Sequence, residues 1–401
     1  MPLDADFLVI GAGVVGLSLG VELLNQFPKS KVVVIDKEEK LGAHASGRNS
    51  GVLHAGFYYS PDSLKARFCR EGNEELRKLI YDNQIPMKAL GKIVVAKNKL
   101  ESERLESLHQ RGLINGVKLE LLPESDLKSF EPLAKTHEKF LWSPDTAVSD
   151  PTKVLAALAT KFEAKGGILL LAKRVSVKED KSVWIDSRKV KFNHVFNSAG
   201  VNAVHIANTL GLGREYGLLP VLGIYKTNSI KNLPLRTLVY PVPDPVNPFL
   251  GVHFTVTVDG LVKIGPTAIP VLGREQYGPN YRPDFLDIKS TSKSLHALLS
   301  NSFQETLRIS ITEISKFSSR KLLKESSSLV PLASSTSGWT RKPPGLRAQL
   351  VNLNTGQFEQ DFVVRTEDCF THILNAVSPG WTAAIPFSKW VVSQFASTQS
   401  D

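Results

Sequence analysis

The chain has 401 residues, of which 42% are hydrophobic and 22% are charged. A chain of this length can bury two separate cores, and the composition is that of a globular rather than a disordered protein. The net charge of +10 comes from scattered basic residues without an aromatic-basic stripe, so we expect no nucleic acid partner. The surplus of positive charge is equally consistent with an acidic substrate and with an anionic membrane surface as partner.

Compartment and metal content can also be predicted from residue types. The two cysteines, Cys69 and Cys369, lie far apart and form no Cys-x-x-Cys pattern, which favours a reducing compartment without disulfides. Neither a signal peptide nor an apolar run long enough to cross a membrane is recognisable. We therefore expect a cytoplasmic protein, with peripheral contact to the inner membrane face as an alternative. No His, Asp and Glu cluster has ligand spacing, so no metal is expected.

The first 36 residues have the pattern of a dinucleotide-binding unit. An apolar run from Phe7 to Ile10 predicts a buried strand, and a helix is expected from Val14 to Phe27. A second strand, Lys31 to Ile35, ends at Asp36. Between the first strand and the helix stand three glycines, Gly11, Gly13 and Gly16.

Each part of this pattern has a physical role in holding a dinucleotide. Gly11 permits the tight turn, Gly13 allows close approach of a pyrophosphate, and Gly16 lets the helix pack on the strand. The helix N-terminus supplies free N–H groups for phosphates. Asp36 stands where a carboxylate accepts hydrogen bonds from a ribose. The alternative is a loop that is glycine-rich by chance.

Further elements follow in chain order. A helix is expected from Pro61 to Asp82, and the strand Gly91 to Ala96 crosses into a second domain. Asp150 caps a helix that ends at Lys165. The strand His194 to Asn197 closes at Ala199 and Gly200 before another helix, which is where a doubly wound sheet meets its ligand.

The second domain is expected to contain antiparallel strands between residues 218 and 265. Within this stretch, Tyr240 to Pro245 reads as a rigid loop and Phe249 to Thr255 as a strand. Residues 287 to 337 read as helical and polar. The last helix is expected to start near Ser378-Pro379-Gly380 and to end around Phe395.

Several separated stretches carry a family resemblance. The polar segment from His44 to Gly56 resembles FAD-dependent oxidoreductases of the D-amino-acid-oxidase superfamily, in which this segment passes under the flavin. The whole chain further resembles the L-2-hydroxyglutarate dehydrogenase/oxidase family, in stretches that follow one another along the sequence: Asn49–Gly56, Ser63–Arg67, Gly91–Ala96, Tyr240–Thr255, Gly265-Pro266 with Arg274-Glu275, Gly345–Gln349 with Asp361-Phe362, and Asn375–Pro379. Thr267 and Gly380-Trp381 depart from the family pattern, and a bulky indole beside the flavin could alter access for the electron acceptor.

The elements and the resemblance together predict an α/β fold. It combines a Rossmann-type FAD-binding domain, with a mostly parallel sheet, and an α+β substrate domain built on an antiparallel sheet. The predicted FAD-binding domain is discontinuous, comprising residues 1–86, 148–215 and 345–401, and the substrate domain comprises residues 87–147 and 216–344. The residues that the resemblance and the glycine pattern assign to FAD are Gly11, Gly13, Val14, Val15, Gly16, Asp36, Lys37, Ser46, Asn49, Ser50, Gly51, Val175, Ala199, Gly200, Pro379 and Gly380.

The resemblance implies oxidation of an L-2-hydroxy acid, with L-2-hydroxyglutarate as the expected substrate and 2-oxoglutarate as product. Hydride leaves for flavin N5 while a base takes the hydroxyl proton. Histidine suits the base because its ordinary pKa is about 6.5. His54 and His253 are the candidates, and His253 is preferred because it lies on a strand expected to roof the flavin.

A dicarboxylate substrate requires cations and hydroxyl donors. The candidates are Arg274, Arg347, Lys65 and Arg67, with Tyr58 and Tyr59 as donors; each has a structural or surface role as its alternative. The electron acceptor is left open among oxygen, a quinone and a carrier protein. Two rival functions remain: an FAD-dependent amine or amino-acid oxidase, which needs no protein base, and a non-catalytic FAD-binding scaffold.

Overall fold

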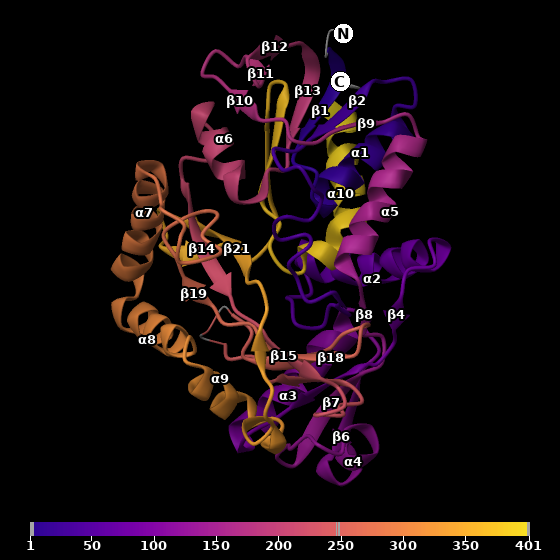
Figure 1. Cartoon of the computed structure of the whole chain (residues 1–401), viewed down its shortest axis with the longest axis vertical. Coiled ribbons are helices and arrows are strands. Elements are labelled where there is room, and N and C mark those ends of the chain that lie inside the picture. The colour runs from indigo at the N-terminus through magenta and orange to yellow at the C-terminus, as the bar shows by residue number, and fades with distance from the viewer. Residues whose placement is uncertain (1–3, 246, 248, 399–401) are drawn as a thin grey trace.

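The computed structural model describes residues 4–245, 247 and 249–398. Its first layer is a six-stranded sheet in the order β23-β24-β13-β1-β2-β9 (Figure 1). All neighbours pair in parallel except β23 and β24. The mostly parallel sheet confirms the predicted fold class. Its strands are β1 (Ala5–Ile10), β2 (Val32–Ile35), β9 (Ile168–Leu170), β13 (Phe192–Asn197), β23 (Val363–Glu367) and β24 (Phe370–Asn375).

Helices cover this sheet because its central strands are apolar on both faces. On one face, α10 (Gly380–Thr398) packs between α1 (Val14–Gln26) and α2 (Leu64–Asp82), and α5 (Pro151–Ala164) lies beside α1 (Figure 1). Their core includes Leu17, Phe162 and Phe387, all fully buried. The other face carries α6 (Ala203–Thr209) and a small antiparallel sheet of β10 (Val175–Val177), β11 (Val183–Ile185) and β12 (Arg188–Val190).

The second half of the molecule is built on a largely antiparallel eight-stranded sheet in the order β20-β15-β18-β17-β16-β5-β7-β6. Only β5 and β16 pair in parallel among these strands as described. The helices α3 (Lys99–Ile114) and α4 (Leu127–Phe130) lie at its lower end (Figure 1). The strands are β5 (Lys92–Val95), β6 (Glu120–Pro123), β7 (Lys139–Ser143), β15 (Lys226–Ser229), β16 (Leu238–Pro241), β17 (His253–Val256), β18 (Leu261–Gly265) and β20 (Thr340–Arg341).

Two smaller sheets connect the halves. One joins β3 (Val52–Leu53), β8 (Ala147–Ser149) and β4 (Met87–Lys88). The other has the order β19-β14-β21-β22, covered by α7 (Phe285–Asn301) and followed by α8 (Phe303–Ser315) and α9 (Ser319–Ser326). Its strands are β14 (Tyr216–Gly223), β19 (Ile269–Pro270), β21 (Gly345–Asn352) and β22 (Gln357–Phe358). Because β14 pairs with β21, this sheet crosses the predicted boundary at residue 344, and the domain division stays a prediction.

Two elements near Tyr240 differ from the expectation. Tyr240 and Pro241 were expected in a loop but form the end of β16, where Tyr240 lies opposite Val94 of β5. Pro241, which has no N–H to donate, is the last residue of this strand. Conversely, Phe249 precedes the strand, since its N–H donates to the Asn247 side chain and its ring packs on Phe358.

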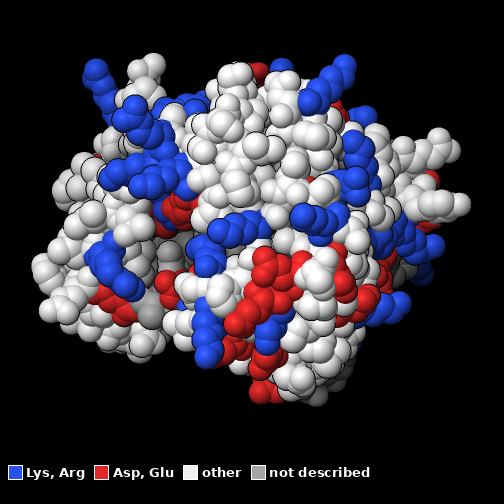
Figure 2. Space-filling model, turned by 90° about the horizontal axis from the view of Figure 1, so that it is seen from below, with Lys and Arg blue, Asp and Glu red and all other residues white. Residues whose placement is uncertain are grey.

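Among the described residues, no helix is both long enough and apolar enough to cross a bilayer. On the face seen from below, Lys and Arg side chains are interrupted by groups of Asp and Glu (Figure 2). The +10 net charge is thus not gathered into one continuous surface there. The cytoplasmic location and the peripheral membrane contact stay predictions.

Buried histidines make the fold sensitive to acid. His194 of β13 contacts Thr371, and His372 of β24 accepts a hydrogen bond from Asn197. Burial lowers the pKa of both imidazoles from 6.5 to about 4. Below pH 6.5, His194 and His372 therefore bind protons in the unfolded chain but stay neutral in the folded chain until the pH approaches 4. We expect the free energy of unfolding to decrease as the pH falls from 6.5 to 4, as measured by urea titration.

The double variant H194Q/H372Q tests this expectation. Its unfolding free energy should depend less steeply on pH in the same range, because glutamine does not titrate there. H296Q, on an exposed residue of α7, serves as the matched control. An unchanged slope in the double variant would assign the acid sensitivity to other groups.

Candidate active site

The first turn of the parallel sheet is closely packed. Gly11 has φ +101°, a conformation that favours glycine, and a Cβ at Gly16 would lie 1.8 Å from the Gly11 carbonyl oxygen. Gly13 is the N-cap residue before α1 and has no side chain to cap the helix. The N–H of Val14 donates to Ser46 Oγ at 3.0 Å, which brings the segment after β2 onto the start of this helix.

Asp36 is fixed at the end of β2. Its carboxylate accepts hydrogen bonds from the N–H of Ala12 at 2.8 Å and of Glu38 at 3.0 Å. The N–H of Lys173 donates to the Asp36 carbonyl oxygen, which places the start of β10, with Val175, beside this strand end. The acid therefore stands next to the glycine turn, where a ribose hydroxyl would meet it.

The other predicted cofactor residues extend from this turn in two directions. Ala199 and Gly200 follow β13, where the Ser198 N–H donates to the Ile10 carbonyl oxygen at 3.0 Å. Asn49 donates to Ser46 O and accepts from the Gly51 N–H. Ser50 lies between them, and Pro379 and Gly380 open α10. Val15 lies in the first turn of α1 and Lys37 directly follows Asp36.

These residues fit a dinucleotide cofactor. The start of α1, where the cap residue Gly13 has no side chain, and the close contact between Gly11 and Gly16 would hold the pyrophosphate. The fixed Asp36 carboxylate would hold the ribose. Residues 49–51 lead from this point towards α10, so a long cofactor would lie along them. Which residues contact it stays a prediction.

A second set of residues lies beyond the start of α10. Thr382 Oγ1 donates to the Val52 carbonyl oxygen and accepts from the His54 N–H, both at 3.2 Å. His54 is thereby held against the first turn of α10, and its buried Nδ1 has no partner among the described residues. Trp381 also lies in this turn, packed on the main core with its indole N–H unpaired among those residues.

His253 has a defined tautomer. Its Nδ1 lies 2.8 Å from the Gly251 carbonyl oxygen, which can only accept a hydrogen bond. The proton is therefore on Nδ1, and Nε2 keeps its lone pair. The ring stacks on Tyr240 at 3.9 Å. Burial, and then the nearby Lys92 and Arg347, lower the pKa of His253 to about 3, so the imidazole is neutral at physiological pH.

The two candidate bases lie near each other and near one lysine. Burial first, then Lys92 and then His253, lower the pKa of His54 well below its usual 6.5. Lys92 therefore faces both imidazoles. It begins β5, is fully buried, and its Nζ lies 4.4 Å, 4.5 Å and 4.8 Å from the ring centroids of Phe57, Tyr58 and Tyr240.

The structure separates the predicted substrate cations. Arg347 of β21 donates to the Thr267 carbonyl oxygen at 2.8 Å and lies close enough to His253 to affect its pKa. Arg274 instead donates to the fully buried Asp287 carboxylate at 2.5 Å and to Asn202 at 3.2 Å. Its guanidinium is thus engaged in an ion pair with α7.

The remaining predicted substrate residues lie on and before α2. Arg67 is exposed and pairs with Glu71 at 3.0 Å. Lys65 is buried beside Asp361, and burial lowers its pKa to about 8. Tyr58 contacts Lys92, while Tyr59 adjoins Cys69 and Ser378. Of the predicted set, the structure brings His54, His253, Arg347 and Tyr58 together with Lys92, which the sequence analysis did not select.

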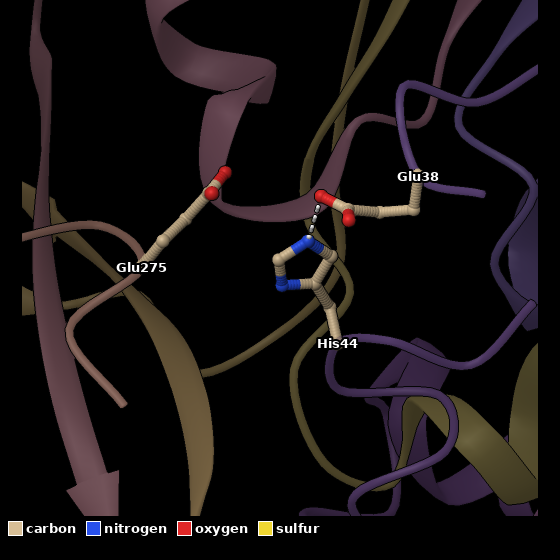
Figure 3. Close-up of side chains that lie close together, drawn as sticks. All are labelled: Glu38, His44 and Glu275. Atoms are coloured by element: carbon tan, nitrogen blue, oxygen red, sulfur yellow. Dashed lines mark hydrogen bonds and ion pairs between the residues drawn. The ribbon is translucent and has the colours of Figure 1, made fainter. Parts of the chain in front are cut away.

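One further polar cluster joins the two halves (Figure 3). The ligand atoms of Glu38, His44 and Glu275 lie within 4.8 Å of one another. Lys37 Nζ lies among them, 3.0 Å from Glu275 and 3.3 Å from His44, and pairs also with Glu38. Hydrogen bonds from Lys37 and then His44 lower the pKa of Glu38 to about 2. The Lys37 ammonium group is the cation of this cluster. The cluster is therefore explained as an ion-pair network.

Comparison with known sequences identifies the family of the chain. The profile of the FAD-dependent oxidoreductase family, named DAO, matches residues 6–393. The chain belongs to this family. The cofactor of this flavoprotein family is FAD, and the site described above fits it.

Proteins that are similar along nearly the whole chain indicate which branch of this oxidoreductase family it belongs to. The flavoprotein is 33% identical to the L-2-hydroxyglutarate dehydrogenase of Escherichia coli K12 over 397 residues, covering 97% of the chain and 92% of that protein. It is 31% identical to the mitochondrial L-2-hydroxyglutarate dehydrogenase of Homo sapiens over 418 residues, with 97% and 88% covered. The predicted membership of the L-2-hydroxyglutarate dehydrogenase family is thereby confirmed.

Solved structures confirm the fold. The FAD-bound L-α-glycerophosphate oxidase of Mycoplasma pneumoniae superposes with a TM-score of 0.74 at 22% identity, covering 97% of this flavoprotein and 94% of that chain. Glycine oxidase from Geobacillus kaustophilus gives a TM-score of 0.70 at 16% identity over 97% and 94%.

Proposed function

We propose that this flavoprotein oxidises L-2-hydroxyglutarate to 2-oxoglutarate. The observation that carries the proposal is the similarity to L-2-hydroxyglutarate dehydrogenases from bacteria and animals along nearly the whole chain. FAD, when bound, supplies the acceptor for the hydride that leaves the substrate α-carbon. The chain's own residues must bind the carboxylates, orient the α-carbon and take the hydroxyl proton.

The neutral imidazoles support a hydroxy-acid oxidation. His253 offers a lone pair on Nε2 because its Nδ1 proton is held by Gly251, and we propose it as the base. His54, whose N–H donates to Thr382 of α10, would orient the substrate hydroxyl. Arg347 is the cation next to His253 and would bind a substrate carboxylate.

An anaerobic titration tests the proposal. The yellow holoprotein should bleach when L-2-hydroxyglutarate is added, because the flavin becomes reduced. The D-enantiomer, L-lactate, glycerol 3-phosphate and sarcosine in parallel cuvettes should bleach it slowly or not at all. Bleaching by sarcosine instead would support the rival amine oxidase, and no bleaching by any compound would support the non-catalytic scaffold. Reoxidation by oxygen or by a soluble quinone then identifies the electron acceptor.

A further inference from the structure

We propose that Lys92 Nζ binds a carboxylate of the substrate, as the second cation of the site beside Arg347. This inference rests on the proposed oxidation of a dicarboxylate. Lys92 is the first residue of β5, and the sequence patterns did not indicate it as a substrate-binding residue. The ligand chemistry is a carboxylate, either the one next to the reacting carbon or the distal one.

The Lys92 amino group is buried without a hydrogen-bond acceptor among the described residues. Lys92 is fully buried, and among the residues that the structure describes none accepts a hydrogen bond from Nζ. The faces of Phe57, Tyr58 and Tyr240 surround it, and such contacts stabilise a cation only in part. A buried charge normally has an ionic or hydrogen-bonded partner, so a group that binds there is expected to be an anion.

The described groups around Lys92 provide no anion. The titratable groups that face Lys92 are His54 and Tyr58 on the segment after β3, Cys69 on α2, Tyr240 on β16, and His253 on β17. Burial raises the pKa of the Cys69 thiol to about 12 and that of the Tyr240 hydroxyl well above its usual 10. These groups are all neutral at physiological pH, so none of them balances the charge of a protonated Lys92, and a bound anion would supply that balance.

Four other cations of the predicted sites already lie beside carboxylates. Arg67, Arg274 and Lys37 each have a carboxylate within 3.0 Å, and Lys65 lies beside Asp361. Lys92 differs from all four, and it is also the one that faces both candidate bases. A carboxylate bound at Lys92 would therefore hold the substrate next to His54 and His253.

Proton uptake gives this inference a distinctive signature. Burial lowers the pKa of Lys92 to about 7, so at pH 8 most of the free holoprotein carries a neutral amine there. A bound carboxylate favours the ammonium form. Binding of a dicarboxylate at pH 8 should therefore take up close to one proton per site.

The experiment uses the holoprotein and glutarate, which keeps both carboxylates and lacks the reacting hydroxyl. Calorimetric titration at pH 8 in two buffers of different ionisation enthalpy measures affinity and proton uptake together. In K92M we expect affinity to fall by roughly 10-fold to 100-fold, as for loss of a charge-assisted hydrogen bond, and the proton uptake to disappear. K226M, at a buried lysine on β15 of the same sheet, is the matched control and should match the wild type.

Protein stability and FAD content separate binding from folding. Because methionine removes an unpaired buried charge, K92M should unfold at a temperature no lower than that of the wild type. Wild-type binding without proton uptake, or K92M affinity and KM for L-2-hydroxyglutarate equal to wild type, would overturn the inference while leaving the proposed function intact. Failure of L-2-hydroxyglutarate to bleach the wild-type flavin would instead overturn the function. A monocarboxylic 2-hydroxy acid distinguishes the two carboxylates: its KM rises in K92M only if Lys92 binds the carboxylate next to the hydroxyl.

Discussion

Glutamine in place of His253 should lower kcat for L-2-hydroxyglutarate by roughly 10²-fold to 10⁴-fold, the usual contribution of a general base. Glutamine can still donate to the Gly251 carbonyl oxygen but offers no basic nitrogen at the Nε2 position. Binding of glutarate and FAD content should stay near the wild-type values. Stopped-flow measurement of flavin reduction isolates the affected step.

The same measurement on H54Q provides the comparison. His54 lacks a partner on Nδ1, so its tautomer is not fixed by the described residues and its loss should cost less. A large defect in H54Q together with a small one in H253Q would assign the base to His54. Normal flavin reduction in the double variant would remove both from the mechanism and favour the amine oxidase.

Alanine at Gly16 should abolish tight FAD binding. The added Cβ would lie 1.8 Å from the Gly11 carbonyl oxygen, a backbone atom, so α1 must move away from β1 and carry its N-terminus off the phosphates. A displacement that costs on the order of 3 kcal/mol weakens binding by about 100-fold. The purified variant should therefore be nearly colourless, as measured by the ratio of flavin absorbance to protein absorbance.

Gly278 offers the matched control for this variant. A Cβ there has no atom within 4 Å, so G278A should retain the yellow colour. Reconstitution with added FAD, followed by flavin fluorescence quenching, gives the two dissociation constants. A Gly16→Ala protein that purifies with full FAD content would show that the contact between α1 and β1 can relax without moving the phosphate-binding end.

Local sequence patterns were sufficient to predict the FAD-binding unit. The glycines, the apolar strands and Asp36 lie within 36 residues, and each element follows from its own residues. The start of α10 was predicted from the residues at which the helix begins, and the role of the polar segment after β2 from its resemblance to FAD-dependent oxidoreductases. The confirmed fold class and family depend on these stretches.

Contacts between distant segments were not predictable from those patterns. Arg274 appeared as a free cation because its partner, Asp287, stands on a separate helix, α7. Lys92 precedes four apolar residues and resembles an ordinary charged residue at a strand end. Only the pairing of β5 with β16 places it against Tyr240. Likewise, the prolines after Tyr240 indicated a loop, while the neighbouring strand β5 draws that residue into the sheet.

The order of strands in the parallel sheet has a consequence for synthesis of the protein. β1 emerges from the ribosome long before β13 and β24, which complete its side of the sheet. Roughly 20 to 70 s of translation separate β1 from β24 at ordinary elongation rates. During that interval the apolar faces that α10 finally covers stay exposed to the cell, where chaperones can bind them. The amount of folded flavoprotein that a cell produces would then depend on its chaperone capacity as well as on its supply of FAD.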